Sequence, residues 1–303
     1  MKSGLLGIEG LSRAHIDAIL SRSHDFQPPP NEPFKRFDVL KGKTIVNLFF
    51  EASTRTRTSF EIAAKRLGAD VLSITASASS VSKGESLVDT LNTLGAMRPD
   101  AIVMRHAASG APHFLSRYLP VPIINAGDGT HEHPTQALLD ARTIIDRCQT
   151  LDNLRIAIIG DIAHSRVARS NIYLLSKFGV QIVLCGPASL LPSEMKQMAP
   201  GVELTSDMRE AIRDVDVIMM LRVQLERQHE AAFPADEYFS FYGLRPEHIL
   251  LAKPNVIVMH PGPINRGREI SSEVADSQRS AILNQVENGI AVRMAVLERV
   301  LGQ

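Results

Sequence analysis

The strongest constraint on the fold of this chain is a regular alternation of short apolar runs with segments of helical periodicity. This alternation is typical of α/β proteins, in which helices connect the strands of a parallel sheet. Phe60, Ala63 and Leu67, for example, recur at the spacing of one helix face. The pattern predicts eight strands, at Thr44–Phe50, Val71–Ile74, Ala101–Met104, Pro122–Ala126, Arg155–Ile159, Gln181–Cys185, Val215–Leu221 and Val256–Met259.

The length and the grouping of these strands indicate two domains. The chain has 303 residues, and a domain ordinarily takes about 150. Four predicted strands precede residue 130 and four follow residue 150, with a predicted helix near Thr135–Cys148 as the link. We therefore predict an α/β fold with two domains, residues 1–140 and 141–283, each a mostly parallel sheet flanked by helices. A helical pattern covers Ala275–Val300, for which either domain is a candidate packing partner, and of the two we expect residues 284–303 to pack back on the first domain.

Composition excludes several classes of protein. Hydrophobic residues make up 44% of the chain and charged residues 22%, values typical of soluble globular proteins. Net charge is zero, there is no Trp and aromatic residues are 5% of the chain, which disfavours nucleic-acid binding. No targeting signal or apolar run of membrane-spanning length is visible, so we expect a cytoplasmic protein. Cys148 and Cys185 are too few for a disulfide framework, and we expect both to be reduced and buried.

Polar residues follow many of the predicted strands. In an open parallel sheet, ligands bind beyond the carboxyl ends of the strands, so these positions are candidates for a binding site. The segments are Glu51–Arg57, Arg105–His106, His131–His133, Asp161–Arg169, Arg222–Gln224 and His260–Pro263. Their distribution predicts two binding crevices, one in each domain.

The densest group is Ser53-Thr54-Arg55-Thr56-Arg57, at a predicted strand-to-helix turn. Hydroxyl groups, unpaired backbone N–H groups and the positive end of a helix dipole together make an anion site, and phosphate is the expected occupant. The alternative is a Ser/Thr helix cap beside two solvated arginines. Capping needs one such hydroxyl and no arginine.

Arg105, His133 and Gln136 are further candidates in the first half. Arg105 ends a predicted buried strand, where a charge needs an anionic partner, either a ligand or an acid such as Glu51. His133 and Gln136 flank a predicted helix start with Pro134 in its first turn. His131 and His133 do not indicate a metal site, because no thiol or HExxH pattern accompanies them, and a neutral His133 that donates to a carbonyl oxygen is the better interpretation.

The second half carries arginines suited to carboxylates. Arg166 and Arg169 lie near a predicted helix N-terminus, and Arg222 and Gln224 alternate so that they share one side of a strand end. An arginine fork can hold a carboxylate through two hydrogen bonds. Surface arginines are the alternative. The turn at Gly160 lacks the G-x-G-x-x-G pattern, so a nicotinamide cofactor is not expected, and we predict no cofactor at all.

Together these motifs resemble the aspartate/ornithine carbamoyltransferase family over nearly the whole chain. Ser53 to Arg57 with Ser59-Phe60-Glu61 is similar to the carbamoyl phosphate signature, completed by Arg105 and His133-Pro134-x-Gln136. Arg222-Val223-Gln224 and His260-Pro261-Gly262-Pro263 resemble the aspartate enzymes, whereas the His-Cys-Leu-Pro segment of the ornithine enzymes is not found. The resemblance implies a transferase of pyrimidine biosynthesis that carbamoylates the α-amine of L-aspartate. Another amine such as L-ornithine, or a non-catalytic anion-binding homologue, is the alternative.

The resemblance also implies roles for individual residues. Residues 1–140 would bind carbamoyl phosphate and residues 141–283 aspartate, with the active site in the cleft between the domains and at a subunit interface. Arg55, Thr56, Arg105, His133 and Lys83 would be catalytic. Carbamoyl phosphate would be bound by Ser53, Thr54, Arg55, Thr56, Arg105, His133, Gln136, Ser79, Gly262 and Pro263. Aspartate would be bound by Lys83, Arg166, Arg222 and Gln224.

Ser79, or its neighbour Ser80, and Lys83 would come from an adjacent subunit of a homotrimer, as the resemblance implies. A regulatory or dihydroorotase-like chain is a further candidate partner. The Gly262–Pro263 bond is expected to be cis. Residues Gln224–Phe241 are either a lid that orders on aspartate binding or an ordinary solvated loop. In the lid hypothesis, Glu51, Arg105 and Arg227 exchange partners as the lid closes.

Overall fold

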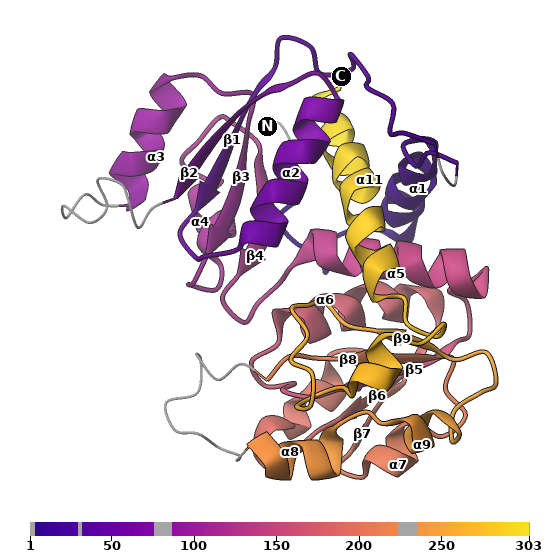
Figure 1. The fold of residues 1–303 in the computed structure, drawn as a ribbon. Helices are drawn as coiled ribbons and strands as arrows, with labels where there is room; N and C mark the ends of the chain where they lie inside the picture. The colour runs from indigo at the N-terminus through magenta and orange to yellow at the C-terminus, as the bar shows by residue number, and fades with distance from the viewer. Residues whose placement is uncertain (1–3, 30–31, 76–86, 224–234, 303) are drawn as a thin grey trace. The chain divides into compact units, whose positions relative to one another are not determined.

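The structure is a computed structural model that describes residues 4–29, 32–75, 87–223 and 235–302. The chain forms two compact units (Figure 1). The first comprises Met1–Leu138 and Glu287–Gln303, and the second comprises Leu139–Val286. Among the described residues, no helix combines the length and apolar character that crossing a membrane requires.

The first unit is built on a parallel sheet of four strands in the order β2-β1-β3-β4. The strands are β1 (Thr44–Phe49), β2 (Asp70–Thr75), β3 (Ala101–His106) and β4 (Ile123–Asp128). Its helices are α1 (Arg13–Asp25), α2 (Thr54–Arg66), α3 (Leu87–Ala96), α4 (Ala111–Leu115), the start of α5 (Pro134–Cys148) and most of α11 (Ile282–Leu301). Helices α3 and α4 bury Leu91, Leu94 and Leu115 in one cluster with apolar strand residues. Right-handed crossovers put α2 on the opposite face of the sheet.

The N-terminal segment pairs with the outer strand β4. Leu5 forms a parallel bridge with Ile124, and its carbonyl accepts a hydrogen bond from the Asn125 N–H at 2.8 Å. The Asn125 side-chain amide donates to the Leu6 carbonyl at 2.8 Å. The Ile8 N–H donates to Glu132 Oε2 at 2.7 Å. The segment is therefore attached to the outer edge of the sheet by both backbone and side-chain hydrogen bonds.

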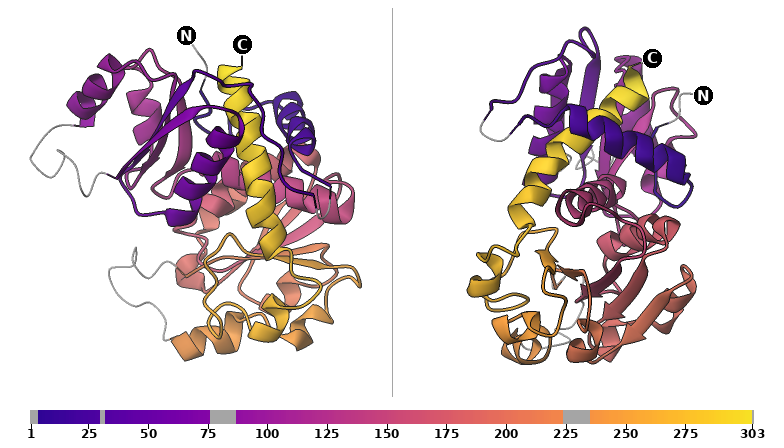
Figure 2. Two further views of the ribbon diagram at one scale, coloured as in Figure 1. Left: turned by 45° about the horizontal axis from the view of Figure 1, so that its top comes forward. Right: turned by 90° about the vertical axis from the view of Figure 1, so that its right-hand side faces the viewer.

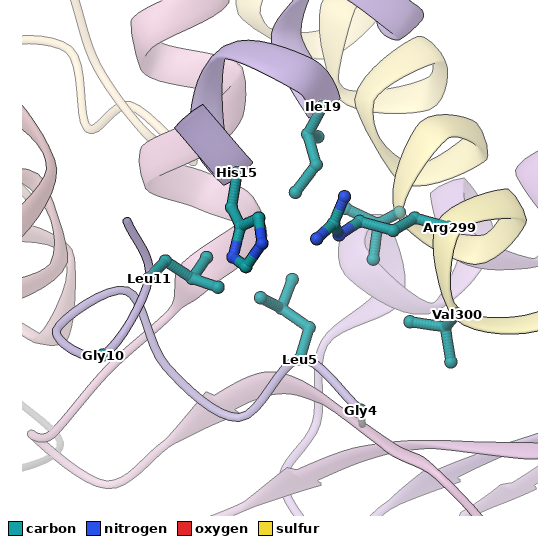
Figure 3. Close-up of a pocket in the computed structure, with 9 residues that line it drawn as sticks. Gly4, Leu5, Gly10, Leu11, His15, Ile19, Arg299 and Val300 are labelled. Carbon is teal, nitrogen blue, oxygen red and sulfur yellow. The ribbon is translucent and has the colours of Figure 1, made fainter. Parts of the chain in front are cut away.

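Helices α1 and α11 lie side by side in the first unit (Figure 2). Arg22 of α1 forms an ion pair with Glu298 of α11, with Nε 2.6 Å from Oε2. Beside them lies a cavity of about 310 Å³, lined mainly by aliphatic side chains, into which His15 and Arg299 extend (Figure 3). None of the residues predicted to bind substrate lines this cavity.

The second unit is built on a parallel sheet of five strands in the order β7-β6-β5-β8-β9. The strands are β5 (Arg155–Ile159), β6 (Gln181–Cys185), β7 (Val202–Thr205), β8 (Val217–Met220) and β9 (Ile257–Met259). The helices are the rest of α5, α6 (Arg166–Leu175), α7 (Met208–Ala211), α8 (Ala235–Tyr242), α9 (Pro246–Ile249), α10 (Ser272–Ala275) and the first residues of α11. Short 3₁₀ helices occur at Ser176–Phe178, Ala188–Leu190 and Ser193–Gln197.

All eight predicted strands are present, and so is the α/β fold with parallel sheets flanked by helices. Four expectations need correction. Strand β7 was not predicted. Residues 235–241, part of the predicted lid or loop, belong to α8, whose Tyr238 and Tyr242 are buried in the core. Cys185 is buried as expected, but Cys148 is only partly buried.

The fourth correction concerns the predicted helix over Ala275–Val300, which is interrupted between α10 and α11. The cause is pairing of this segment with β9. The Val258 N–H donates to the Arg279 carbonyl, and the Ala281 N–H donates back to the Val258 carbonyl, both at 2.8 Å. The helix is interrupted because these backbone groups are already hydrogen-bonded to a strand and cannot also form the hydrogen bonds of a helix.

Gly160, directly after β5, occupies a position that a larger residue cannot fill without strain. Its φ is 139°, and a Cβ there would lie 2.9 Å from Leu221 Cβ and 3.0 Å from the Leu221 carbonyl oxygen. We expect Gly160→Ala to lower the free energy of unfolding by about 1–3 kcal/mol, as backbone strain and overpacking typically do. Urea denaturation measures this.

Gly10 supplies the matched control for the Gly160 experiment. A Cβ at Gly10 meets no atom within 4 Å, and its φ lies outside the positive region. Gly10→Ala is expected to leave the free energy of unfolding within about 1 kcal/mol of the original. An equal loss in both variants would contradict the steric account of Gly160.

Candidate active site

The topology of the first sheet brings three predicted segments to one edge. Strands β1, β3 and β4 are neighbours, so the residues that follow them lie beside one another. Phe49 at the end of β1 is in register with Arg105 of β3, and the Phe50 N–H donates to the Arg105 carbonyl at 2.9 Å. The N-terminus of α2, Arg105 and the segment that leads to His133 therefore belong to one group.

Helix α2 begins at Thr54, immediately after the turn from β1. Ser53 is its N-cap, and within the described residues the Ser53 side chain makes no capping hydrogen bond. Thr56 is buried, whereas Thr54 and Arg55 are exposed. The first turn contains no acidic residue, so nothing in it opposes the positive potential of the helix N-terminus. These features suit an anion, and they differ from an ordinary hydroxyl cap.

Arg105 forms the ion pair with Glu51 that the sequence analysis named as an alternative. Its Nη2 lies 2.8 Å from Glu51 Oε1, and its Nη1 donates to the Ala126 carbonyl at 3.3 Å. The Arg105 side chain is 11% exposed and that of Glu51 is 26% exposed. These bonds fix the guanidinium at the end of β3, beside β4. The ion pair does not exclude a ligand role, because one guanidinium has five N–H donors.

His133 and Gln136 are both buried at the start of α5. The Gln136 N–H donates to the His133 carbonyl at 3.0 Å, which closes the first turn of the helix. Glu132, next in sequence, is 1% exposed and accepts hydrogen bonds from the Ile8 and Glu9 N–H groups. Sequence reasoning missed this role of Glu132. The Glu132 carboxylate ties the turn before His133 to the N-terminal segment.

His106, adjacent to Arg105, is a pH-sensitive element of the same edge. Burial lowers the pKa of His106 below its usual value of 6.5, and its Nδ1 accepts a hydrogen bond from the Ala108 N–H at 2.8 Å. The ring is therefore mostly neutral in the folded protein at and above about pH 6.5. Unfolding lets it bind a proton more readily, so its contribution to stability is complete above about pH 6.5 and is lost as pH falls toward the lower folded pKa.

When the pH is lowered from about 7.5 to about 5.5, we expect the free energy of unfolding to fall less in His106→Gln than in the original protein. Urea unfolding at both pH values measures the difference. Burial also lowers the pKa of His248, but that residue is present in both proteins and its effect cancels. An identical pH dependence of the two proteins would show that His106 does not contribute.

The second sheet brings the remaining predicted segments to its own carboxyl edge. Strands β5, β8 and β9 are neighbours, and they lead to α6, Arg222 and the His260 segment respectively. Ser165 caps α6 by accepting a hydrogen bond from the Ala168 N–H at 3.0 Å, which places Arg166 at the first helical position. Arg166 is 5% exposed and Arg222 is partly buried.

The His260–Pro263 segment is held by a network of buried polar side chains. The Gly262 N–H donates to His260 Nδ1 at 2.8 Å, so Nε2 carries the proton and faces Glu269 Oε1 at 3.2 Å. The His260 N–H donates to Gln285 Oε1, and the Gln285 amide donates to Asp140. The prediction of a cis Gly262–Pro263 bond is confirmed. Glu269, completely buried, was not predicted, because an isolated acid carries no signal of its partner.

Four predicted site residues lie outside the described part of the chain: Ser79, its alternative Ser80, Lys83 and Gln224. Arg227 of the lid hypothesis lies outside it as well. The remaining predicted residues form two groups, one in each unit. The first comprises Ser53, Thr54, Arg55, Thr56, Arg105, His133 and Gln136, and the second comprises Arg166, Arg222, Gly262 and Pro263.

Comparison with known proteins identifies both halves of the chain. Residues 4–146 match the carbamoyl-P binding domain of aspartate/ornithine carbamoyltransferase, and residues 152–300 match its Asp/Orn binding domain. A relative from Solibacter usitatus, the aspartate carbamoyltransferase catalytic subunit, is 80% identical, with both chains covered over 100% of their length. The corresponding subunit from Geobacter sulfurreducens is 54% identical, covering 98% of this chain and 96% of the relative.

Solved structures give the same result. Aspartate transcarbamoylase from Trypanosoma cruzi in complex with N-(phosphonacetyl)-L-aspartic acid is 34% identical, with a TM-score of 0.91 and coverage of 99% of this chain and 96% of that one. Ornithine carbamoyltransferase from Pyrococcus furiosus is 29% identical, with a TM-score of 0.88 and coverage of 99% and 97%.

Proposed function

The chain belongs to the aspartate/ornithine carbamoyltransferase family, and on that premise we propose that it is an aspartate carbamoyltransferase. It transfers the carbamoyl group of carbamoyl phosphate to the α-amine of L-aspartate, giving N-carbamoyl-L-aspartate and phosphate. The observation that carries this proposal is the 80% identity over the full length of a relative named for that activity.

The first unit supplies a binding site for carbamoyl phosphate. Ser53, Thr54, Arg55 and Thr56 at the N-terminus of α2 hold the phosphate through hydroxyl groups, backbone N–H groups and the Arg55 charge. The lack of a capping bond from Ser53 within the described residues supports this role, because its hydroxyl is left to a ligand. Gln136 binds the carbamoyl amide. Ser79 and the backbone carbonyls of Gly262 and Pro263 complete the contacts.

The second unit supplies the aspartate contacts. Arg166 and Arg222 each bind one of the two substrate carboxylates, with help from Gln224 and Lys83. Two guanidinium groups suit a dicarboxylate, whereas ornithine has a cationic side chain that two arginines would repel. The positions of Arg166 at the start of α6 and of Arg222 just past β8 support the assignment, since β5 and β8 are neighbouring strands.

The proposed mechanism needs no covalent intermediate. The aspartate amine attacks the carbamoyl carbon, negative charge develops on the carbamoyl oxygen, the C–O bond to phosphate breaks, and the proton lost by the amine passes to the departing phosphate. Thr56, Arg105 and His133 donate hydrogen bonds to the developing oxyanion, and the arginines hold two mutually repelling anions in reacting geometry. The ion pair with Glu51 supports this role for Arg105 because it fixes the guanidinium in advance.

We further propose that the chain acts in the cytoplasm, in pyrimidine biosynthesis, as a homotrimer with shared sites. In this proposal, Ser79 and Lys83 of one subunit enter the site of the next. The free thiols of Cys148 and Cys185 suit a reducing compartment.

The test is product formation by the purified chain from carbamoyl phosphate, with L-aspartate and L-ornithine in parallel reactions. We expect N-carbamoyl-L-aspartate alone. Carbamoyl-ornithine alone would overturn the assignment of Arg166 and Arg222. No product with either amine, from a chain that is folded and assembled, would favour the non-catalytic anion-binding homologue.

The two carboxylate contacts can be tested separately from the phosphate site. We expect Arg166→Ala and Arg222→Ala each to raise the KM for aspartate by at least about 30-fold, the effect of removing one partner of a desolvated charge pair. Affinity for carbamoyl phosphate should stay within a few-fold. Steady-state kinetics and isothermal titration measure the two quantities.

Arg169 provides the control, since it lies one helical turn from Arg166 on α6 and is partly buried. Its Nη1 donates to the Ser165 carbonyl at 3.4 Å. Arg169→Ala should change the KM for aspartate little. A comparable increase in all three variants would indicate a general electrostatic effect and would contradict specific contacts.

A further inference from the structure

Two histidines and one aspartate of the first unit come together outside the proposed active-site residues. His113 lies on α4, Asp128 ends β4, and His131 follows in the next turn. One ring nitrogen of each histidine and one carboxylate oxygen of Asp128 all lie within 4.8 Å of one another. The two rings meet edge to face, with centroids 5.4 Å apart. From this juxtaposition we propose a binding site for one Zn²⁺ ion, held by His113, Asp128 and His131.

The Asp128 carboxylate is buried and held in a fixed orientation. It is 0% exposed. Oδ2 accepts hydrogen bonds from the Gly110 N–H at 2.7 Å, and Oδ1 accepts from the Asn125 amide at 2.9 Å and the Glu132 N–H at 3.1 Å. All three donors are uncharged N–H groups, so they do not neutralise the carboxylate. Among the residues that the structure describes, neither lysine nor arginine pairs with Asp128, and His131 is its one ionisable neighbour within salt-bridge distance. A bound cation would balance this buried charge.

The two imidazoles complete a metal-binding set. His131 Nδ1 lies 3.0 Å from Asp128 Oδ2, close to the spacing of two ligand atoms on one zinc ion with bonds of about 2.0 Å. His113 Nδ1 is buried and has no hydrogen-bond partner among the described residues. A buried ring nitrogen in this state is costly unless something binds it. A metal ion bound through His113 Nδ1 would supply that missing interaction.

The donor set favours zinc over harder ions. Imidazole nitrogen suits Zn²⁺, whereas Mg²⁺ and Ca²⁺ prefer sites made entirely of oxygen atoms. Three protein ligands leave one position of a tetrahedral ion for water. In the sequence, His131 stands beside His133 and no metal site was expected from that pair. The second histidine of the proposed site is instead His113, because α4 packs against β3 and β4 and so brings His113 near the end of β4.

Zinc at this position would stabilise the turn between β4 and α5. Residues Asp128 and His131 would be fixed to α4 through the ion, two residues before His133. The consequence for the protein is a turn whose stability depends on zinc. Binding can be measured without reference to catalysis, so failure of this proposal is distinguishable from failure of the proposed function.

The experiment measures zinc binding by the full chain after treatment with a chelator and gel filtration. Isothermal titration with ZnCl₂, checked by elemental analysis, is expected to show one tight zinc ion per chain, and zinc should raise the melting temperature. MgCl₂ and CaCl₂ should do neither. His113→Phe and His131→Asn should each weaken zinc binding by at least about 100-fold, since even loss of a group that only supports a ligand typically costs 10–100-fold.

The variants are chosen so that folding is retained. Phe keeps the ring packing of position 113, and Asn at position 131 keeps a donor for Asp128, which itself is left intact because it accepts buried hydrogen bonds. His24→Ala and His133→Gln control for adventitious histidine binding and for the neighbouring histidine, and both should bind zinc as the original chain does. The proposal is overturned if the original chain binds no stoichiometric zinc. It is also overturned if the His113 and His131 variants bind as tightly as the controls.

Discussion

Arg105→Ala is expected to lower kcat by about 10²–10³-fold, the typical cost of removing one donor to a developing oxyanion. Arg105 ends a buried strand beside β1 and β4, where it is already fixed by Glu51 and the Ala126 carbonyl. A fixed guanidinium stabilises the transition state without reorganising during the reaction. The variant should remain folded, because the Glu51 side chain is already 26% exposed while it is paired with Arg105, so water can solvate its charge when the partner is removed.

The measurement pairs steady-state kinetics with urea denaturation. Arg142→Ala is the matched control, because Arg142 is buried and forms an ion pair with Asp146 at 2.8 Å, yet has no proposed ligand role. We expect Arg142→Ala to lower stability with little change in kcat. If the ion pair with Glu51 were the whole role of Arg105, Glu51→Gln and Arg105→Ala would be equally harmful. Unchanged turnover in Arg105→Ala would refute its proposed catalytic role.

Mixing two inactive variants is expected to restore activity if the sites are shared between subunits. Arg55→Ala and Lys83→Ala should each abolish most turnover as pure trimers. When the two are dissociated, mixed in equal amounts and reassembled, a site is intact only where a chain with Arg55 meets a neighbour with Lys83. Random assembly makes about one quarter of the sites intact, so about a quarter of the original activity should return.

The control for the hybrid experiment is mixing without dissociation, which should restore nothing. A second control combines Arg55→Ala with Arg105→Ala. In the proposed shared site, Arg55 and Arg105 come from the same subunit, so reassembly should not recover activity. No recovery in the Arg55 and Lys83 hybrid, when hybrid trimers are shown to have formed, would contradict the shared site.

The strands were predictable because burial leaves a local trace. Strands such as Ile156–Ile159 are buried on both faces and appear in the sequence as continuous apolar runs. Strand β7, at the edge of its sheet, buries only Val202 of its four residues, so it carries no such run. The break before α11 was not predictable either, because it depends on pairing with Val258, about twenty residues away in the sequence.

The candidate site was predictable where its residues are clustered in the sequence. The composition of the segment Ser53 to Arg57 by itself indicates an anion site. The parallel topology of the first sheet then brings Arg105 and His133 to the same edge of that sheet. Residues whose function depends on a distant partner gave no signal. Glu132 bonds to the Ile8 backbone across 124 positions, and Glu269 is recognised only through His260. His113 likewise acquires its significance from a packing contact that no local pattern encodes.

The pairing of the N-terminal segment with β4 also protects the first sheet from self-association. An outer strand with unpaired N–H and C=O groups is a template on which another chain can add. Leu5 forms a bridge with Ile124, and the Leu5 and Leu6 carbonyls accept hydrogen bonds from the Asn125 backbone N–H and side-chain amide, which would otherwise be open to such addition. A Cβ on Gly4 would come within 2.8 Å of the Ile123 backbone nitrogen, so the fit at this edge tolerates no side chain. The segment that pairs with β4 therefore blocks this edge against the addition of another chain, and its removal would expose the edge of the sheet.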